Sequence, residues 1–180
     1  MLKFPKTCTD CRLHRTRTKI VWGSGSPYAS LAFIGEGPGH DEDLAGEAFV
    51  GKAGQLLTKV LKLLSASRQD VLILNLVKCR PPNNRNPKPD EIITCHKWLS
   101  QQLALAKNVR VIVALGRVSW FGLTGEKTSV TANRGTIKKM GKYKIIYTYH
   151  PSYLLRNRSI DVMKDFIRDI RTGLKLAEMR

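Results

Sequence analysis

Three polar side chains of this sequence stand where aliphatic runs end. Glu36 and His150 each follow such a run, and Asn75 lies inside another. An asparagine amide is costly to bury unless it is hydrogen-bonded, and ligands of open α/β sheets gather at the carboxyl ends of the strands. A lone histidine at a strand end is more often structural, but three polar residues at three strand ends favour a shared function. We therefore expect Glu36, Asn75 and His150 to meet in one polar binding pocket.

Two glycine-rich segments after the first aliphatic run could shape this pocket. Residues 35–39 read Gly-Glu-Gly-Pro-Gly, and three glycines in five residues let backbone amides approach a ligand closely. The segment is not a Walker A loop, because no Gly-Lys-Ser/Thr follows it. It is not a dinucleotide fingerprint either, because no third glycine falls at the position which that motif requires. Phe49 lies between glycines in residues 46–54, where its ring either stacks on a flat ligand or folds onto the core.

The four cysteines predict a metal site. Cys8 and Cys11 are spaced as Cys-x2-Cys, which supplies two ligands to one metal, and Cys79 and Cys95 could supply two more. No apolar stretch of a signal peptide follows Met1, so we expect a reducing cytoplasm in which disulfides are disfavoured. Zinc and an iron–sulfur cluster both accept four thiolates, and the spacing does not choose between them. Four unrelated buried thiols are the less favoured alternative.

The charge of the chain indicates a polyanionic partner. Thirty-one Lys+Arg residues against 14 Asp+Glu give a net charge of +17, and nucleic acid is the commonest polyanion for such a surface. A basic surface without a partner is the alternative that charge alone leaves open. The hydrophobic content of 42% fits a globular chain, and no apolar run reaches the ~20 residues of a membrane-spanning helix. We expect a cytoplasmic, nucleoid-associated protein that does not bind membranes.

Aliphatic runs and amphipathic segments alternate along the chain and predict its fold class. Strands are expected at residues 31–35, 71–77, 109–115 and 144–149, and helices at 55–65, 90–106, 117–121 and 160–176. This order predicts an α/β fold, a three-layer α/β/α sandwich around a central four-stranded, mainly parallel sheet. We expect a single domain of residues 1–180, in which residues 1–30 form an N-terminal segment that carries two metal ligands.

Together these segments resemble the iron–sulfur (family 4) uracil-DNA glycosylases over most of the chain. The matching pieces are Cys8-Thr9-Asp10-Cys11, Gly35–Gly39 with Glu42-Asp43, Phe49-Val50-Gly51, Asn75-Leu76-Val77-Lys78-Cys79-Arg80-Pro81-Pro82, Asn84-Arg85-Asn86-Pro87, Leu115-Gly116-Arg117, Arg134-Gly135 and His150-Pro151-Ser152. Each piece alone is weak, but their order and spacing are specific as a set. The resemblance implies a 4Fe–4S cluster on the four cysteines. It also implies a base excision repair enzyme that hydrolyses the N-glycosidic bond of flipped-out deoxyuridine in DNA.

The resemblance also implies the residues that contact uracil. They are Gly35, Glu36, Gly37, Glu42, Phe49, Asn75 and His150. Phe49 would stack on the base, Asn75 would read its polar edge, and His150 would contact a carbonyl oxygen. Glu42 would stand where the methyl group of thymine would otherwise fit. Glu36, Asn75 and His150 are the expected catalytic residues.

Elementary chemistry agrees with these roles. A carboxamide both donates and accepts, so Asn75 can pair with O4 and N3–H of uracil, whereas cytosine presents the opposite pattern. Uracil leaves as an anion, so a hydrogen bond from His150 to O2 strengthens as the bond breaks. The sugar becomes cationic, and Glu36 can stabilise it or hold the attacking water.

Two positions depart from patterns of related enzymes. Gly37 stands where the best-known uracil-DNA glycosylases carry a water-activating aspartate, as also happens within the iron–sulfur family. The general base is therefore open between Glu36 and a dissociative path that needs little base. Glu47 and Ala48 stand where this family more often has Arg-Pro, which weakens an expected DNA contact and leaves Phe49 in place.

Basic and apolar residues near these motifs are the expected contacts to DNA. They are Lys78, Arg85, Leu154, Leu155 and Arg156, of which the last three suit a loop that wedges into stacked bases. We expect Lys78 to meet a phosphate and the enzyme to be monofunctional, although a lyase that uses Lys78 as a Schiff base is an alternative. A non-catalytic, zinc-stabilised module that binds nucleic acid is the second functional hypothesis. A monomer is the expected oligomeric state.

Overall fold

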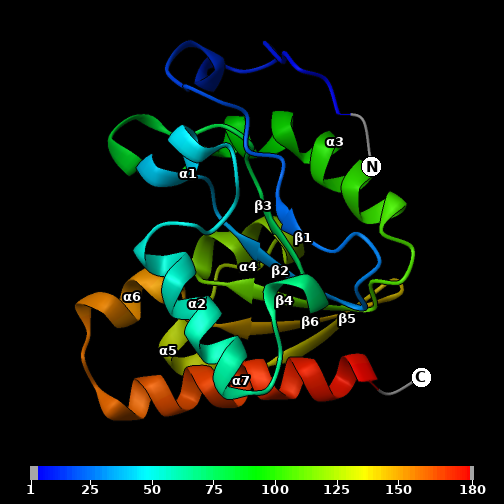
Figure 1. The fold of residues 1–180 in the computed structure, drawn as a ribbon, viewed down its shortest axis with the longest axis vertical. Coiled ribbons are helices and arrows are strands. Elements are labelled where there is room, and N and C mark those ends of the chain that lie inside the picture. Colours follow the sequence, from blue (N-terminus) through cyan, green and yellow to red (C-terminus); the bar gives the residue numbers. More distant parts are fainter. Residues whose placement is uncertain (1–3, 179–180) are drawn as a thin grey trace.

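The four aliphatic runs form the centre of the sheet in the computed structural model, which describes residues 4–178 (Figure 1). They are β2 (Leu31–Gly35), β3 (Leu72–Asn75), β4 (Val111–Leu115) and β6 (Tyr143–Thr148). These strands are parallel neighbours in the order β3-β2-β4-β6. Every residue of β2, β3 and β4 is buried, as expected for strands that are covered on both faces. The predicted α/β class and the parallel centre of the sheet are therefore confirmed.

The sheet has six strands, so the predicted number of four is wrong. β1 (Ser24–Gly25) pairs antiparallel with β3 at one edge, and β5 (Ile137–Met140) pairs antiparallel with β6 at the other. β1 has only two residues, which is too short for any periodic signal. β5 carries Lys138 and Lys139 and has no buried residue. Lysines on an edge strand oppose pairing with other chains, and they also hide the strand from a hydrophobicity pattern.

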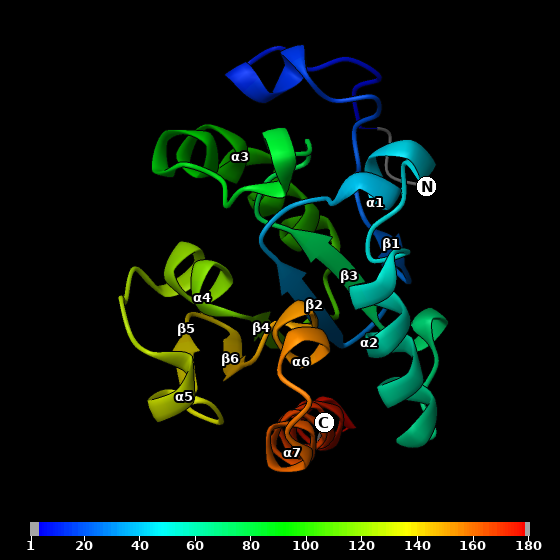
Figure 2. The same cartoon turned by 90° about the vertical axis from the view of Figure 1, so that its left-hand side faces the viewer.

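Helices cover both faces of this sheet, as Figure 2 shows from the side. α3 (Pro89–Leu105) and α4 (Arg117–Thr124) pack on one face, and α2 (Lys52–Leu63) and α7 (Ile160–Glu178) pack on the other. The two faces follow from alternation along the strands. Ala32 and Ile34 of β2 belong to the core under α3, whereas Leu31 and Phe33 belong to the core under α7. No helix within residues 4–178 is long and apolar enough to cross a membrane.

Short elements follow the carboxyl ends of three parallel strands. α1 (His40–Ala45) follows β2, the 3-10 helix η3 (Pro82–Asn84) follows β3, and α6 (Pro151–Arg156) follows β6. The remaining short helices of the described chain are η1 (Arg12–Arg15), η2 (Arg68–Asp70) and α5 (Val130–Asn133). α6 begins with Pro151, whose fixed φ suits a first helical position. These elements surround the edge at which the predicted pocket residues stand.

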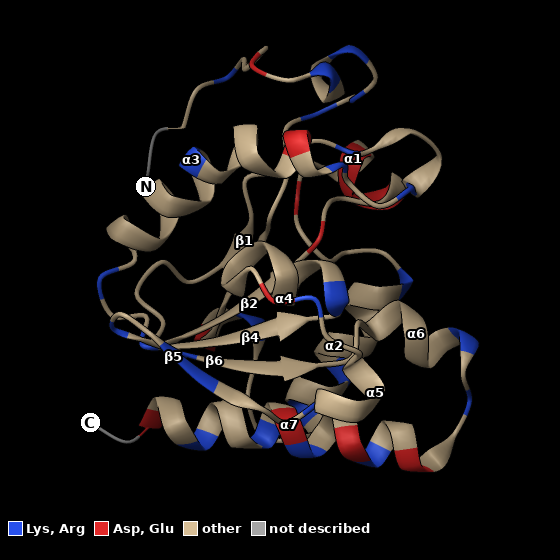
Figure 3. Ribbon diagram, turned by 180° about the vertical axis from the view of Figure 1, so that it is seen from behind, with Lys and Arg blue, Asp and Glu red and all other residues tan. Residues whose placement is uncertain are grey.

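The N-terminal segment is fastened to the rest of the chain by a buried carboxylate. Asp43 of α1 is 1% exposed, and its oxygens accept hydrogen bonds from the backbone N–H of Thr18 at 2.9 and 3.0 Å and of Lys19 at 3.3 Å. Farther along, the Val21 N–H donates to the carbonyl of Lys78 at 2.8 Å. Figure 3 shows acidic residues gathered in α1, at the start of α3 and in α7, while Lys and Arg are spread over the fold.

A second buried carboxylate fixes α7 to the sheet and predicts a stability effect. Asp169 of α7 accepts hydrogen bonds from Arg134 Nε at 2.9 Å and from Thr148 Oγ1 at 2.6 Å. Asp169→Ala leaves the Arg134 guanidinium without its buried partner, and we expect it to lower the free energy of unfolding by about 3 kcal/mol. Urea unfolding followed by circular dichroism measures this change. Asp161→Ala, which removes a carboxylate that is 89% exposed, is the control; equal midpoints for both variants would contradict the expectation.

Candidate active site

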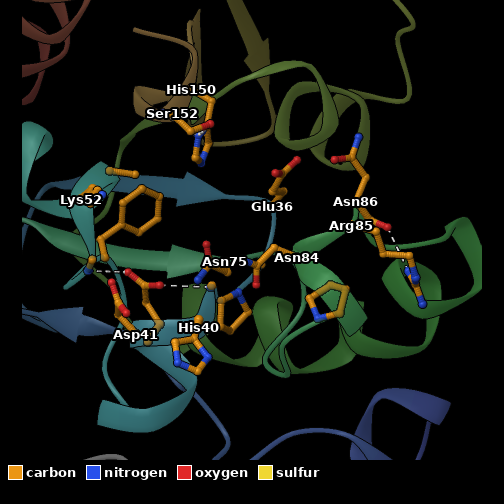
Figure 4. A pocket seen from close by; sticks show the side chains of 18 of the residues that line it. Glu36, His40, Asp41, Lys52, Asn75, Asn84, Arg85, Asn86, His150 and Ser152 are labelled. Carbon is orange, nitrogen blue, oxygen red and sulfur yellow. Dashed lines mark hydrogen bonds between the residues drawn. The ribbon is translucent and has the colours of Figure 1, made fainter. Parts of the chain in front are cut away.

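A cavity of about 420 Å³ opens at the carboxyl edge of the sheet (Figure 4). Glu36 follows β2, Asn75 is the last residue of β3, and His150 follows β6, and all three line this cavity. Parallel strands bring their carboxyl ends to one edge, so three distant positions of the chain meet in space. A cavity of this volume suits a small organic ligand. As expected from the sequence, Glu36, Asn75 and His150 therefore line one cavity.

The Asn75 carboxamide is held in the cavity wall with an open hydrogen-bonding site. Its residue is 2% exposed, and its Oδ1 has no hydrogen-bond partner within residues 4–178. Gly35 lies opposite Asn75 in the parallel β2–β3 pair. A Cβ on Gly35 would stand 2.5 Å from Asn75 Oδ1 and 2.6 Å from Phe49 Cζ, so glycine is required for the amide and the ring to approach. An unpaired buried acceptor is costly, and a ligand that donates a hydrogen bond would satisfy it.

Phe49 agrees with one of its two predicted alternatives, a ring folded onto the core. It is 6% exposed and belongs to the core under α7, yet its ring also lines the cavity. The ring centroid lies 5.8 Å from that of His150 at an angle of 40°. The backbone is left-handed, with φ of 56°, and Arg68 holds it by donating to the carbonyls of Phe49 at 2.9 Å and Ala48 at 2.7 Å. Sequence reasoning missed Arg68, because nothing in its neighbourhood indicates such a long-range contact.

His150 is held as a neutral hydrogen-bond donor toward the cavity. Its Nδ1 accepts the backbone N–H of Ser152 at 3.1 Å, and the Ser152 hydroxyl lies 2.8 Å from the same atom. A backbone amide can only donate, so the proton of the neutral ring is on Nε2. Burial, together with the positive charge of Arg156, lowers the pKa of His150 to about 4. The ring is therefore neutral at physiological pH and can donate from Nε2.

Glu36 and Asn84 add a carboxyl and an amide to the lining of the cavity. Burial raises the pKa of Glu36, and the charge of Arg156 opposes this shift. Figure 4 shows the side chain of Asn84 near that of Asn75. Its Oδ1 accepts a hydrogen bond from Arg80 Nε at 2.6 Å, and its φ of 54° is left-handed. Asn84 lines the cavity and had no assigned role from the sequence; its place in the Pro- and Asn-rich loop was the available signal.

Glu42 and Gly37 also line the cavity. The Glu42 carboxylate accepts hydrogen bonds from the backbone N–H of Gly39 at 3.1 Å and of Gly51 at 2.8 Å. It therefore joins the two glycine-rich segments that form one wall. A Cβ on Gly37 would stand 2.8 Å from Val77 Cγ2, so any side chain there would have to displace a buried neighbour. The close packing at Gly37 leaves little room for an aspartate with this backbone.

The four cysteines line a second, smaller cavity beside Lys78 and Trp98. All four are free thiols. Burial raises the pKa of Cys11 and Cys79, and that of Cys95 to about 11, so thiolates at these positions need a cationic partner. Arg17 Nη1 donates to Cys79 Sγ at 3.3 Å. Within the described chain no three such donors are spaced for a single metal ion. The four thiols around this cavity are the side chains that could hold a metal centre.

The structure corrects two of the expected DNA contacts. Lys78 is 1% exposed, and its Nζ donates to the carbonyl of Asn75 at 2.6 Å, so its ammonium does not reach a phosphate. Burial lowers the pKa of Lys78 to about 7. Leu154 is 4% exposed and belongs to the core under α7, so it cannot insert between bases. Its neighbour Leu155 is 44% exposed and remains available.

Arg85 and Arg156, two of the expected DNA contacts, both line the cavity but differ in their ion pairing. Arg85 donates to both oxygens of the buried Glu91, at 2.7 and 2.8 Å, and so fixes the loop before α3. Arg156 ends α6, is exposed, and forms no ion pair within the described residues. Arg156 is therefore free to meet an anion at the cavity mouth, whereas Arg85 is already engaged.

The lowered pKa of His150 predicts that the protein loses stability as the pH falls from about 6.5 to about 4. An unfolded histidine titrates near its ordinary value of 6.5, whereas folded His150 takes up its proton only near pH 4. Between these values the unfolded chain binds more protons, so stability falls as pH drops, by at most about 1.4 kcal/mol per unit from this group. We expect His150→Gln to remove this share in urea titrations at pH 4.5 and 7. His96→Gln, on the exposed side of α3, is the control; an unchanged pH dependence in His150→Gln would contradict the assignment.

Comparisons with known proteins agree on one family. A family model described as the uracil DNA glycosylase superfamily matches residues 22–171. A Type-4 uracil-DNA glycosylase of Thermotoga maritima is 48% identical over 92% of this chain and 86% of its own length. One from Archaeoglobus fulgidus is 43% identical over 83% and 78%. A Type-5 uracil-DNA glycosylase of Pyrobaculum aerophilum is 32% identical over 79% and 72%. On this match and on the fold, the chain belongs to the uracil-DNA glycosylase superfamily.

Proposed function

We propose that this protein is a monofunctional Type-4 uracil-DNA glycosylase, which releases uracil from DNA and leaves an abasic site. The observation that carries the proposal is the Asn75 carboxamide, which belongs to a residue that lines the cavity and whose buried Oδ1 has no hydrogen-bond partner among residues 4–178. Uracil offers N3–H as a donor at that oxygen and O4 as an acceptor for the amide nitrogen. Cytosine reverses both positions and would leave two buried polar groups facing like partners. The relatives named Type-4 uracil-DNA glycosylase support the same activity.

The target nucleotide has to leave the base stack to reach this cavity, which costs a few kcal/mol and least at a mispair. In the proposed complex the uracil ring stacks on Phe49 and pairs with Asn75. Glu42, which already bridges Gly39 and Gly51, lies in the wall that would meet a thymine methyl group. Thymine would then be excluded by shape and cytosine by hydrogen bonding.

Cleavage of the C1′–N1 bond places negative charge on uracil and positive charge on the sugar. The neutral His150 donates from Nε2 to uracil O2, and this hydrogen bond strengthens as the base becomes an anion. Glu36 stabilises the cationic sugar and holds the water that adds to C1′, and it takes up the proton that this water loses. Burial raises the pKa of Glu36, which makes its carboxylate a stronger proton acceptor than an exposed one. Glu36 is assigned this role because it lines the cavity with a carboxylate, whereas its neighbour Gly37 has no side chain.

Two residues at the end of α6 are the proposed contacts to DNA. Arg156 meets the phosphates beside the target, and the exposed Leu155 next to it takes the space that the flipped nucleotide leaves. A Schiff base from Lys78 is not proposed, because Nζ is buried against the Asn75 carbonyl. Lys52 is the lysine that lines the cavity, and borohydride trapping with Lys52→Met would detect lyase chemistry there. We propose a monomer that acts on chromosomal DNA at the nucleoid.

The resemblance implies a 4Fe–4S cluster, and the donor set fits it. Cys8, Cys11, Cys79 and Cys95 would hold the cluster, which prefers thiolate ligands. When bound, the cluster supplies a cross-link between the N-terminal segment, the end of β3 and helix α3. Arg17 supplies positive charge at the same cavity, and the buried Lys78 also lines it. The role proposed for the cluster is structural, because it joins the segments that carry the pocket walls.

Uracil release tests the proposed function directly. We expect wild-type protein to release uracil from a single-uracil oligonucleotide, detected by strand cleavage in alkali, and to leave matched cytosine and thymine oligonucleotides intact. Asn75→Asp cannot donate to O4, and we expect kcat/KM to fall by at least about 100-fold. Asn108→Asp, whose amide donates to the Tyr28 carbonyl away from the cavity, is the matched control. A wild-type protein that holds its metal and releases no uracil from any substrate would favour the DNA-binding module instead.

Lys78 should link the cluster to the pocket. Lys78→Met keeps the length of the side chain but removes the ammonium that donates to Asn75, and residues just outside a metal site typically affect affinity or activity by 10-fold or more. We expect less iron and sulfide per chain, and kcat lowered by about tenfold with little change in KM. The exposed Lys59→Met on α2 is the control. Iron content and kcat that equal those of the wild type would exclude this role for Lys78.

A further inference from the structure

Two further hollows continue from the cavity along the surface. The first, a groove of about 580 Å³, lies between the start of α3, helix α4 and residues 127–130. It shares Asn86 and Pro87 with the cavity. The second, of about 380 Å³, shares Pro89, Ile92 and Phe121 with the first. Figure 4 shows Asn86 beyond Glu36, on the far side of the cavity from Lys52. The three hollows therefore lie next to one another along the surface, beginning at the cavity.

The walls of the groove combine apolar side chains with positive charge. Its apolar residues are Pro87, Pro89, Ile92, Val118, Phe121 and Val130. Arg117 and Lys127 are exposed at the same groove, and neither forms an ion pair within residues 4–178. Lys127 Nζ lies 5.5 Å from the centre of the Phe121 ring. No acidic side chain lines the groove. An apolar floor beneath unpaired cations suits a ligand with a flat apolar face and a negative charge.

We propose that this groove binds the nucleotide next to the target deoxyuridine on the same DNA strand. The proposal rests on the proposed function, because it requires the target base in the adjoining cavity. The neighbouring base lies on Phe121 and the surrounding apolar residues, and its phosphate faces Arg117 and Lys127. Aromatic side chains with nearby cations are the common way in which proteins hold unpaired bases. The position of the groove next to the cavity and its positive charge favour DNA over a protein segment as the occupant.

This subsite has a consequence for the kind of DNA that the enzyme prefers. A neighbouring base can enter the groove only after it has left its own stack and its complementary base. In single-stranded DNA it gives up only weak stacking, whereas in a duplex it also gives up a base pair. The groove therefore favours uracil in single-stranded or locally melted DNA over uracil in an intact duplex.

A substrate that lacks one neighbouring base tests the subsite. We use single-stranded oligonucleotides in which a tetrahydrofuran residue replaces the base on the 5′ or on the 3′ side of deoxyuridine. For the wild type we expect KM to rise about tenfold on one of the two sides, with kcat little changed. For Phe121→Ala we expect a similar rise in KM with the complete substrate and no further rise with the modified one. The proposal would be overturned if the effects of Phe121→Ala and of the missing base on KM multiplied. It would also be overturned if removing the base on neither side changed KM.

A second variant avoids the question of folding. Arg117→Gln/Lys127→Gln removes two exposed charges, and we expect KM to rise more for the single strand than for a U·G duplex. Lys142→Gln and Leu63→Ala, which alter exposed residues of another loop and of α2, are the controls. Equal losses on both substrates, or a changed oligomeric state with unchanged KM, would overturn the proposal in favour of a general basic surface or a self-contact. Wild-type protein that releases no uracil would instead refute the proposed function.

Discussion

The candidate site depends on one close approach, at Gly35. The parallel register sets Gly35 opposite Asn75, and the missing side chain lets the Phe49 ring and the Asn75 carboxamide occupy the same small space. A Cβ at this position would collide with both groups, so neither could lie where it does. The amide then stands at the end of a buried strand and against a ring that covers it. The strand register, rather than the loops, thus fixes the geometry of this part of the cavity.

The surrounding contacts hold both walls of the cavity against this fixed centre. Asp43 binds the N-terminal segment to α1, which carries the wall residue Glu42. On the other wall, Glu91 binds Arg85 of the loop before α3 and lies 3.8 Å from Arg12, which follows Cys11 in the chain. The segment that carries two cysteines therefore touches both walls. In the proposed enzyme a cluster at the cysteines would set the distance between these walls as well as the stability of the fold.

The sequence predicted the parts of this structure that follow from local patterns. The aliphatic runs gave the four parallel strands, and the polar residues at their ends gave Glu36, Asn75 and His150 as one group. Features set by contacts between distant segments were missed or misjudged. Lysine is usually a surface residue, but the turn after β3 directs the side chain of Lys78 into the core. The hydrophobic pattern of the sequence does not predict that Arg68 donates to the Phe49 carbonyl, nor that the two-residue β1 extends the sheet.

The electrostatics of the site reconcile two opposed requirements of the proposed reaction. A chain with a charge of +17 attracts DNA, yet a cationic histidine beside the leaving base would be costly to bury. Burial and, to a smaller extent, the charge of Arg156 lower the pKa of His150, while Arg156 itself keeps an exposed charge beside the cavity. His150 stays neutral and donates a hydrogen bond instead of a proton. In the proposed reaction the anionic base would be stabilised by a ring that the Ser152 amide already orients, so that this group would not need to reorganise as the bond breaks.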